Sequence, residues 1–503
     1  MKNIFLAIIA LTVIFSSCKK FLVINPELAV AQNTFYKSQS DFTQAVTGIY
    51  APLQPIYNLD WRLTELRSDN AYFFFNVANR GSKPIEDLAT FSIETNNATV
   101  LDSWRNSYLI IARANTVLSL IDAATFDQAA KDVLKGEAMF LRALAYYDLV
   151  RKFGDVPLFV NPATSYEETF KSRIAATAVY EQILSDVTFA TTHLPAKTAQ
   201  PIVGRATSGA AYALLADINV TLKKWSDAEA AARKILTMGY SLLPVYADIF
   251  KPSNKANNEL IFQVNYVEAT TQPLFSDFTY SFIPQLVNPA ILTGVGPAAR
   301  NGNGSFNVPT PEMLASYEDK TKDTRYSSSI GFYTGASPLV GIVYNQTPYV
   351  KKYLYPHAIP FQTNENWPIY RYAEILLVLA ESLNEQGKLA EALLYVNMVR
   401  SRAGLDATVA ADKQKLQEII LHERRIELAF ENKRWYDLVR SGLAVSTINE
   451  FGQKIKANPG NYYYATGNFP PPNTFNITVN SLLLPIPVTE IITNPQLKQN
   501  AGY

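Results

Sequence analysis

The sequence predicts a mainly α fold, in which helical hairpins form a scaffold around one large, irregular, loop-rich insertion. Amphipathic segments with apolar residues at helical spacing occupy about 35–238 and about 369–442. The stretch from about 240 to 367 is rich in proline, asparagine and tyrosine and lacks that period. A second irregular segment covers about 443–503. We therefore expect a single domain from residue 18 to residue 503.

The helices are expected where apolar residues recur at helical spacing and a glycine follows. The clearest one runs from about 127 to 153, with Leu134 and Leu141 on one face and Gly154 after its end. Ser226 and Glu229 form a capping-box pattern at the start of another helix. The remaining strong helices are predicted at about 207–223, 370–386, 389–402, 413–431 and 433–440.

Two of the predicted hairpins match each other without a gap. Residues 215–217 align with 379–381, and residues 224–225 align with 388–389. Small residues at fixed places let two antiparallel helices approach closely, while larger apolar ones fill the groove between neighbouring hairpins. The pattern resembles the tetratricopeptide unit, whose hairpins bury their faces by stacking. Because the two copies lie far apart in the sequence, the block from about 240 to 367 is predicted to be an insertion.

The N-terminus has the pattern of a secretory leader. Lys2 precedes an apolar run over 4–15, and small residues precede Cys18. The run is too short to span a bilayer and is typical of a signal peptide, here residues 1–17. Residues 15–18 resemble a bacterial lipobox, in which the cysteine thiol receives a diacylglyceryl group. We predict lipidation of Cys18, and an ordinary signal peptide with a chance cysteine is the alternative.

The bulk composition indicates a globular body. Lys and Arg number 45 against 44 Asp and Glu, a formal charge of +1, so the basic face that nucleic acid binding requires is not expected. Cys18 is the only cysteine, so no disulfide is expected within the chain. No apolar run after the leader is long enough to cross a membrane. Stability is therefore expected to come from packing.

A charged cluster on the late helices raises the alternative of a surface glycosidase. Its carboxylates are those of Glu423, Glu427, Glu431 and Asp437. Arg434 follows Glu431 by three residues. Arg440 has the same spacing from Asp437. Nearby arginines lower a carboxyl pKa, whereas a general acid needs a raised one, so we predict salt-bridged helix faces and no catalytic residue.

The three histidines do not predict a metal site. His193, His357 and His422 are widely separated, and none has metal-ligand spacing with another or with the cysteine. No P-loop, nucleophile elbow or dinucleotide fingerprint stands in a strand-turn-helix context. We expect no metal and no cofactor.

Aromatic and polar residues gather outside any helical period over 69–81. Sugars present apolar C–H faces and hydroxyl edges, so a ring beside an amide, carboxylate or guanidinium group matches both. Phe73 and Phe75 are expected on the buried side of an alternating strand, which leaves Tyr72 and Phe74 on the other face. The ligand-binding candidates in this stretch are Asp69, Asn70, Tyr72, Phe74, Asn76 and Arg80.

The insertion adds further rings in irregular surroundings, although each of them singly also suits packing. The candidates for ligand contact there are Phe275, Tyr280, Tyr333, Tyr344 and Trp367. The tryptophans of the predicted helices, by contrast, are assigned to the core. These are Trp104, Trp225 and Trp435.

A series of short motifs follows along the chain. It includes Trp104, Tyr108 and Asn115 with their spacing, and then residues 153–158, 204–207, 400–404, 423–428, 434–438, 484–487 and 499–503. Taken in this order, the motifs resemble those of the SusD/RagB-like outer-membrane lipoproteins of nutrient-uptake systems. The resemblance runs from Cys18 to Tyr503.

That resemblance implies a lipid-anchored protein at the outer face of the outer membrane, lying as a lid on a SusC-like TonB-dependent transporter. The helical side would meet the transporter, and the irregular side would capture a glycan or oligosaccharide. The protein would bind its ligand without cleaving it. Lys19 and Lys20 stand where acidic residues often accompany surface export. Peptide binding by the same architecture and a tetratricopeptide-type adaptor for other proteins are the alternatives.

Overall fold

The computed structural model describes residues 35–75, 83–271, 274–295, 304–338 and 343–503. The helices before the insertion are α3 (Gln39–Tyr50), α4 (Leu53–Leu59), α5 (Lys83–Thr90), α6 (Ala98–Leu120), α7 (Gln128–Phe153), α8 (Ala176–His193), α9 (Ser208–Thr221) and α10 (Trp225–Ile235). Those after it are α15 (Tyr372–Glu385), α16 (Leu389–Arg402), α17 (Lys413–Glu427), α18 (Arg434–Arg440), α19 (Ala444–Ala457) and α20 (Val488–Thr493).

The described part of the insertion contains only short elements. Its helices are α11 (Phe278–Phe282), α12 (Ala290–Thr293), α13 (Pro311–Ser316) and α14 (Thr324–Ser329). The strands of the described chain are β1 (Ala71–Tyr72), β2 (Leu260–Val264), β3 (Val308–Pro309), β4 (Ile330–Gly335), β5 (Tyr344–Val350) and β6 (Trp367–Arg371). They form three antiparallel pairs, β1 with β3, β2 with β6 and β4 with β5.

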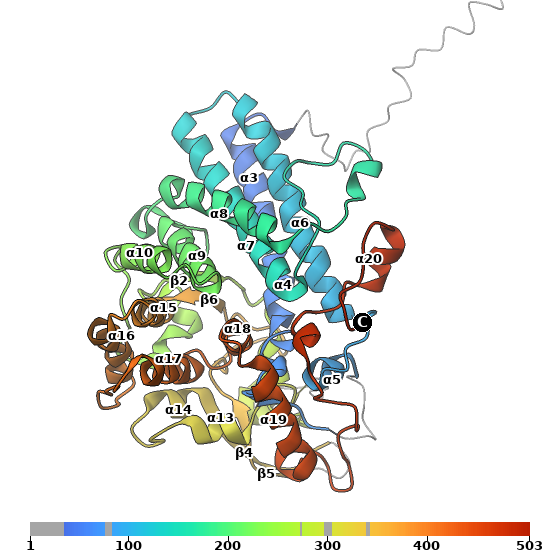
Figure 1. The fold of residues 1–503 in the computed structure, drawn as a ribbon, viewed down its shortest axis with the longest axis vertical. Helices are drawn as coiled ribbons and strands as arrows, with labels where there is room; N and C mark the ends of the chain where they lie inside the picture. Colours follow the sequence, from blue (N-terminus) through green and yellow to red (C-terminus); the bar gives the residue numbers. More distant parts are fainter. Residues whose placement is uncertain (1–34, 76–82, 272–273, 296–303, 339–342) are drawn as a thin grey trace, which may run out of the picture.

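The helices form a continuous stack. Helix α7 packs between α6 and α8, α9 packs between α8 and α10, and α10 continues onto α15, which contacts α16 and α17 (Figure 1). The stack thus passes from the last helix before the insertion to the first helix after it. The prediction of a mainly α fold built on helical hairpins is confirmed. Within the described ranges, no helix combines the length and apolarity needed to cross a bilayer.

The two hairpins that match in sequence lie against each other. The Lys388 ammonium is 2.7 Å from the Glu229 carboxylate, and the Arg233 guanidinium contacts Glu229 at 2.8 Å and Glu391 at 2.5 Å. Glu229 was predicted to close a capping box with Ser226, but α10 begins at Trp225 without a side-chain cap. Glu229 instead joins the two hairpins.

Local sequence signals set the boundaries of α7 but not those of α17 and α19. Asp127 accepts a hydrogen bond from the Ala130 amide at the start of α7, and Gly154, at φ +72°, ends it. Helix α17, predicted to reach 431, ends at Glu427. The backbone then turns through left-handed φ at Phe430 and Asn432. The C-terminal segment, predicted to be irregular, contains the 14-residue helix α19.

The base of the insertion is closed by strand pairing. Strand β2, near its start, lies antiparallel to β6 at its end, with Leu260 opposite Arg371 and Val264 opposite Trp367. The insertion therefore leaves and re-enters the helical stack at one place. Trp104 and Trp435 are buried as predicted, whereas Trp225 is only partly buried against the core.

Candidate functional site

Aromatic side chains from three distant segments, with two leucines from a fourth, meet at the loop-rich end of the molecule. We name this group the aromatic face, and it consists of Phe74, Leu286, Leu292, Tyr333, Tyr344 and Tyr463. Phe74, Tyr333 and Tyr463 are partly exposed, while Tyr344 is buried beneath them. Tyr463 also packs against the main core, while the other members form a cluster of their own, and the group offers ring surface to solvent.

Backbone hydrogen bonds hold Phe74 in place. Its amide donates to the Ser305 carbonyl at 3.0 Å, and the next amide, of Phe75, donates to the Tyr463 carbonyl at 3.0 Å. The Ala465 amide returns a bond to the Phe75 carbonyl at 3.1 Å. Ser305 and Tyr463 both have left-handed φ, +66° and +67°. Because such backbone costs free energy for residues other than glycine, these contacts must fix it firmly.

The rings of the aromatic face contact one another in a row. The Phe74 ring lies 4.9 Å from that of Tyr463, tilted by 31°, and 5.3 Å from that of Tyr344, edge to face. Tyr333 lies 5.8 Å from Tyr344. The centroid distances and angles are those of favourable aromatic pairs. The result is a rigid apolar surface with Tyr333 at one side and Tyr463 at the other.

The buried Tyr344 ties this surface to the backbone beneath it. Its hydroxyl donates to the Gln285 carbonyl at 3.1 Å and lies 3.2 Å from the Ser305 hydroxyl. The Ser305 hydroxyl in turn accepts the Gln285 amide at 2.9 Å. Burial raises the pKa of Tyr344, so the phenol stays neutral. Tyr344 therefore supports the exposed rings from below.

A second small cluster extends the surface. Tyr280, Ile283 and Tyr349 are buried together, and Tyr333 and Leu292 pack against them as well as against the aromatic face. The Tyr280 hydroxyl lies 2.7 Å from Nε2 of His357. Tyr280 thus lies in a supporting layer and exposes almost none of its own surface.

Several predicted ligand contacts are buried and are corrected here. Trp367 is 1% exposed, stacked 5.3 Å from Tyr353 in the core. Tyr72 is 0% exposed, and its hydroxyl is paired with that of Tyr464 at 2.7 Å. Phe275 is buried too. Side chains without exposed surface do not present a face to a sugar, so we assign these three to packing.

Asp69 and Asn70 are also structural in this fold. The Asp69 carboxylate binds Arg434 at 2.8 Å and Arg425 at 2.9 Å. Burial raises the pKa of Asp69, but the two arginines outweigh that effect and lower the pKa to about 2. The Asn70 side-chain oxygen accepts from Arg425 at 2.8 Å. Asp69 and Asn70 thus connect the segment just before β1 to α17 and α18.

Of the twelve predicted site residues, the structure places Phe74, Tyr333 and Tyr344 together. Cys18, Asn76 and Arg80 lie outside the described residues. Phe73 and Phe75 are buried as expected, but Tyr72 is buried as well, because β1 is only two residues long and packs on both sides. The expected two-sided alternation is therefore only half correct.

Tyr463 is the ring that the sequence prediction missed. It lies in a run of three tyrosines flanked by asparagine and alanine in the C-terminal segment, which was described only as irregular. The signal available was that run of rings outside a helical period. Only pairing with Phe75 across more than 380 positions in sequence brings it to the aromatic face.

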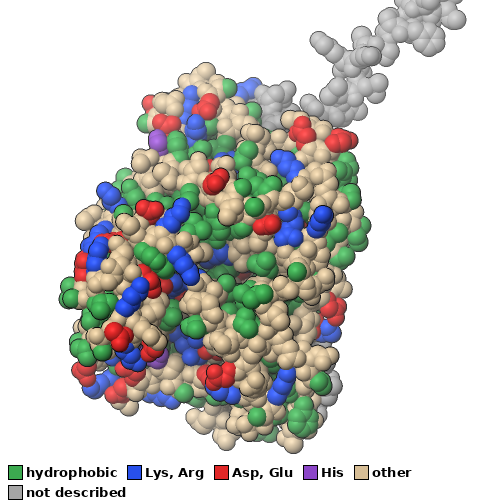
Figure 2. Space-filling view, viewed as in Figure 1, with side chains coloured by type: hydrophobic (Ala, Val, Ile, Leu, Met, Phe, Trp, Pro, Cys, Tyr) green, Lys and Arg blue, Asp and Glu red, His purple; other side chains and the backbone are tan. Residues whose placement is uncertain are grey.

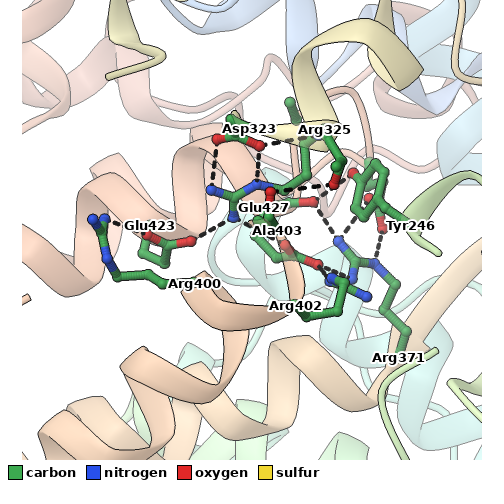
Figure 3. Close-up of polar contacts among 12 residues, drawn as sticks. Tyr246, Asp323, Arg325, Arg371, Arg400, Arg402, Ala403, Glu423 and Glu427 are labelled. Atoms are coloured by element: carbon green, nitrogen blue, oxygen red, sulfur yellow. Dashed lines mark hydrogen bonds and ion pairs between the residues drawn. The ribbon is translucent and has the colours of Figure 1, made fainter. Parts of the chain in front are cut away.

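The charged cluster of the late helices is buried and paired (Figure 3). Arg325 contacts Asp323 at 2.8 Å and Glu427 at 3.0 Å, and it also contacts Glu423. Arg371 contacts Glu427 and lies 3.1 Å from Glu259. Each of these side chains is at most 1% exposed.

Electrostatics in this cluster favour a structural role. Burial raises the pKa of Glu427, but Arg402, Arg371 and Arg325 outweigh it, and the pKa falls well below its usual range. Burial raises the pKa of Glu423 against the opposing arginines. Neither carboxylate reaches solvent, so neither can protonate a glycosidic oxygen of a polysaccharide.

The predicted pairing of the cluster holds in part. Asp437 does bind Arg440, at 2.8 Å. Glu431, however, binds Lys352 at 2.7 Å and Arg371 at 2.8 Å instead of Arg434. Helix α17 ends before Glu431, and this removes the helical spacing on which the predicted pair depended. Within the described chain, no group of three His, Cys, Asp or Glu side chains could hold a metal ion.

A cavity of about 360 Å³ lies elsewhere, between α6, the segment after α7, and α20. Its lining includes Trp104, Tyr108, Phe159 and Phe170. The Tyr108 hydroxyl donates to the Pro157 carbonyl at 2.9 Å. The rings there pack mainly on each other, so we consider this cavity a second candidate and the aromatic face the first.

The chain belongs to the SusD family. A family model described as the SusD family matches residues 258–503, and a second, described as starch-binding and associating with the outer membrane, matches residues 20–220. SusD-like protein P25 of Formosa agariphila is 28% identical over 99% of both chains. A SusD-like protein of Bacteroides ovatus is 25% identical over 99% of this chain and 98% of its own.

Solved structures show the same fold. Surface glycan-binding protein A from Bacteroides fluxus superposes with a TM-score of 0.77 at 23% identity, covering 93% of this chain and 100% of that one. A structure named as a laminarin binding SusD-like protein has a TM-score of 0.73 at 24% identity, with the same coverage. The mainly helical SusD-like architecture predicted from the sequence is thereby confirmed.

Proposed function

We propose that this protein is a non-enzymatic, lipid-anchored surface protein that binds a glycan and delivers it to a SusC-like TonB-dependent transporter. The observation that carries the proposal is the aromatic face, where Phe74, Tyr333 and Tyr463 are held rigidly and remain partly exposed. Rigid rings bind the C–H faces of sugars with little loss of conformational entropy. The names of the laminarin-binding and surface glycan-binding relatives support a glycan as the ligand.

The arrangement of the molecule suits capture at a surface. The first described residues lie at one end of the long axis, and β4 and β5 lie at the other (Figure 1). An anchor at Cys18 would therefore join the described body at the end opposite β4 and β5. Because acyl chains contribute about 0.8 kcal/mol per buried CH₂, a multiply acylated cysteine would hold the chain firmly. Labelled palmitate should enter the wild type and not Cys18→Ala.

The experiment that tests glycan binding is affinity gel electrophoresis in gels that contain one polysaccharide each, such as laminarin or starch. Tyr333→Ala and Phe74→Ala should each weaken the retardation, with a loss of affinity of roughly tenfold, about 1.4 kcal/mol. Tyr166→Ala tests the other candidate, because Tyr166 is 66% exposed and packs on Phe170 of the lining of the cavity between α6 and α20. Equal loss in all three variants, or no retardation by any polysaccharide, would contradict the proposal.

Delivery to a transporter requires a second measurement. The wild type and both face variants should co-purify equally with the transporter, because the aromatic face is proposed to bind glycan and the helical stack to meet the barrel. Loss of the transporter in Tyr333→Ala would instead indicate that the aromatic face is a protein interface, as in an adaptor. Binding of unfolded peptides in place of polysaccharides would favour the peptide-binding alternative.

A further inference from the structure

The segments that build the aromatic face lack charge. No Asp, Glu, Lys, Arg or His occurs in 70–79, 278–299, 301–311, 326–350 or 457–489. In the chain as a whole, 18% of the residues are charged. Loops at a protein surface are normally rich in charged side chains, so such long uncharged stretches call for an explanation.

The structure brings these five segments to one place. The Phe74 amide donates to the Ser305 carbonyl, and the Ser305 amide donates to the Ile283 carbonyl at 2.8 Å. The Tyr344 hydroxyl lies 3.2 Å from that of Ser305, and the Tyr463 ring packs on Phe74. Each uncharged segment therefore contributes a residue to the aromatic face or to its support. The described residues of these segments therefore form a surface that carries no charge of its own.

Two acidic groups at the ends of these segments are bound to neighbouring side chains. The Glu312 carboxylate accepts a hydrogen bond from the Tyr462 hydroxyl and lies 3.9 Å from the Lys454 ammonium. The Asp277 carboxylate accepts from the Asn58 amide at 2.7 Å. These groups are bound to neighbours and do not supply a free ion to the aromatic face.

Several apolar side chains on these segments are exposed, and the exposed polar ones, such as Asn288 and Gln346, are uncharged. Val287 is 61% exposed, Ile291 63%, Val343 83% and Phe469 66%. Elsewhere the surface differs: Figure 2 shows Lys, Arg, Asp and Glu side chains crowded over α16 and α17, and few of them over α19 and the segment after it. The molecule thus separates a charged helical surface from an uncharged loop surface.

We propose that the aromatic face selects neutral glycans over glycans that carry carboxylate or sulfate groups. The inference rests on the proposed function and adds to it the chemical class of the ligand. A neutral sugar ring can place its C–H face on Phe74, Tyr333 or Tyr463 and keep its hydroxyls in water. An anionic sugar on the same rings must lose part of its hydration, and the five segments supply no cation to replace it. The uncharged surface therefore disfavours anionic polysaccharides.

Three arginines adjoin the uncharged segments in the sequence, and one of them, Arg325, is buried and paired with carboxylates. Arg80 follows the first segment, and Arg300 lies between the second and the third. Both lie outside the described residues. The experiment therefore includes their removal.

The experiment compares glycans that differ only in charge. The mature lipoprotein is run in gels containing laminarin or carboxymethylated laminarin, and starch or carboxymethylated starch, at about 50 mM and about 500 mM NaCl. For any backbone that is bound, we expect the neutral form to bind at least roughly tenfold more tightly. Its retardation should be the same at both salt concentrations, because no ion pair contributes.

A charge-insertion variant gives a matched control. Val287→Lys places a cation beside Leu286, whereas Val245→Lys places one at a valine of similar exposure, 54%, before η8 (Tyr246–Ile249), in a different part of the chain. Val287→Lys should raise the affinity for the carboxymethylated glycan several-fold at low salt and lose the gain at high salt. Val245→Lys should leave both affinities unchanged.

Each outcome decides the inference. If the carboxymethylated form binds as tightly as the neutral form or more tightly, the selection of neutral glycans is overturned, while glycan binding stands. Loss of that binding in the double variant Arg80→Ala, Arg300→Ala would assign it to the two arginines. Retardation by no polysaccharide, neutral or carboxymethylated, would overturn the proposed function itself. Neutral preference that survives removal of both arginines would confirm the inference.

Discussion

The helical scaffold and the aromatic face use opposite chemistry. Around Arg371, buried guanidinium and carboxylate groups bind one another at 2.8–3.1 Å and link strand β6 to the end of α17. Around Phe74, the contacts are rings, backbone amides and neutral hydroxyls. Buried ion pairs fix one arrangement because an unpaired partner is costly. In the aromatic face, ring contacts and backbone hydrogen bonds hold the geometry. A ligand there does not have to displace a partner of an ion pair.

The largest effect is expected in the buried ion cluster. Arg371→Ala leaves Glu259, Glu427 and Glu431 without one of their partners, so the free energy of unfolding should fall by about 3–5 kcal/mol. Chemical denaturation measures this. Arg105→Ala is the control, since its pair with Glu490 is more exposed and should contribute less than about 1 kcal/mol. Similar losses in both would contradict the assigned structural role.

A second prediction separates core rings from face rings. Trp367→Ala removes a side chain that is 1% exposed, so the free energy of unfolding should fall by about 3 kcal/mol or more. The glycan affinity of the folded protein should be unchanged. Tyr333→Ala should show the reverse, with a loss of affinity and little change in stability. Denaturation curves and affinity gels on both variants check this. Weaker glycan binding by folded Trp367→Ala would restore that residue as a contact.

Acid should weaken the link between the two regions. The pKa of Asp69 is about 2 in the folded protein and about 3.9 when unfolded, so its ion pairs contribute roughly 2–3 kcal/mol above pH 4. Because the folded pKa is the lower one, that contribution is lost as the pH falls from about 4 to about 2. Across this range, the free energy of unfolding should fall more steeply with decreasing pH in the wild type than in Asp69→Asn. Parallel curves would show that Asp69 does not titrate in this way.

The scaffold was predictable from sequence because its signals are local. Apolar spacing and a glycine place α7, and the full extent of α16 follows from its pattern. The aromatic face was predictable only in part, because its residues meet through long-range pairing. Phe74 and Tyr333 stand out as rings in loops, but nothing near Trp367 in the sequence distinguishes a buried ring from an exposed one. Tyr463 needed the Phe75 pairing, which no local pattern indicates.

The charged cluster shows the same limit. Composition and spacing correctly indicated paired, structural carboxylates, yet the partner of Glu431 was wrong. Helix α17 ends four residues earlier than predicted. Glu431 is bound instead by Lys352, from the insertion, and by Arg371, from β6. Partners from distant segments replaced the neighbour that helical spacing would supply.

Hydrogen–deuterium exchange with and without a retained neutral polysaccharide tests the central claim most directly. The account predicts slower exchange on binding in segments of the aromatic face, at 283–292, 330–335, 344–350 and 463–469, with no change around the cavity between α6 and α20. Protection of 157–170 and 490–497 instead, with the aromatic face unchanged, would contradict it and move the ligand to that cavity.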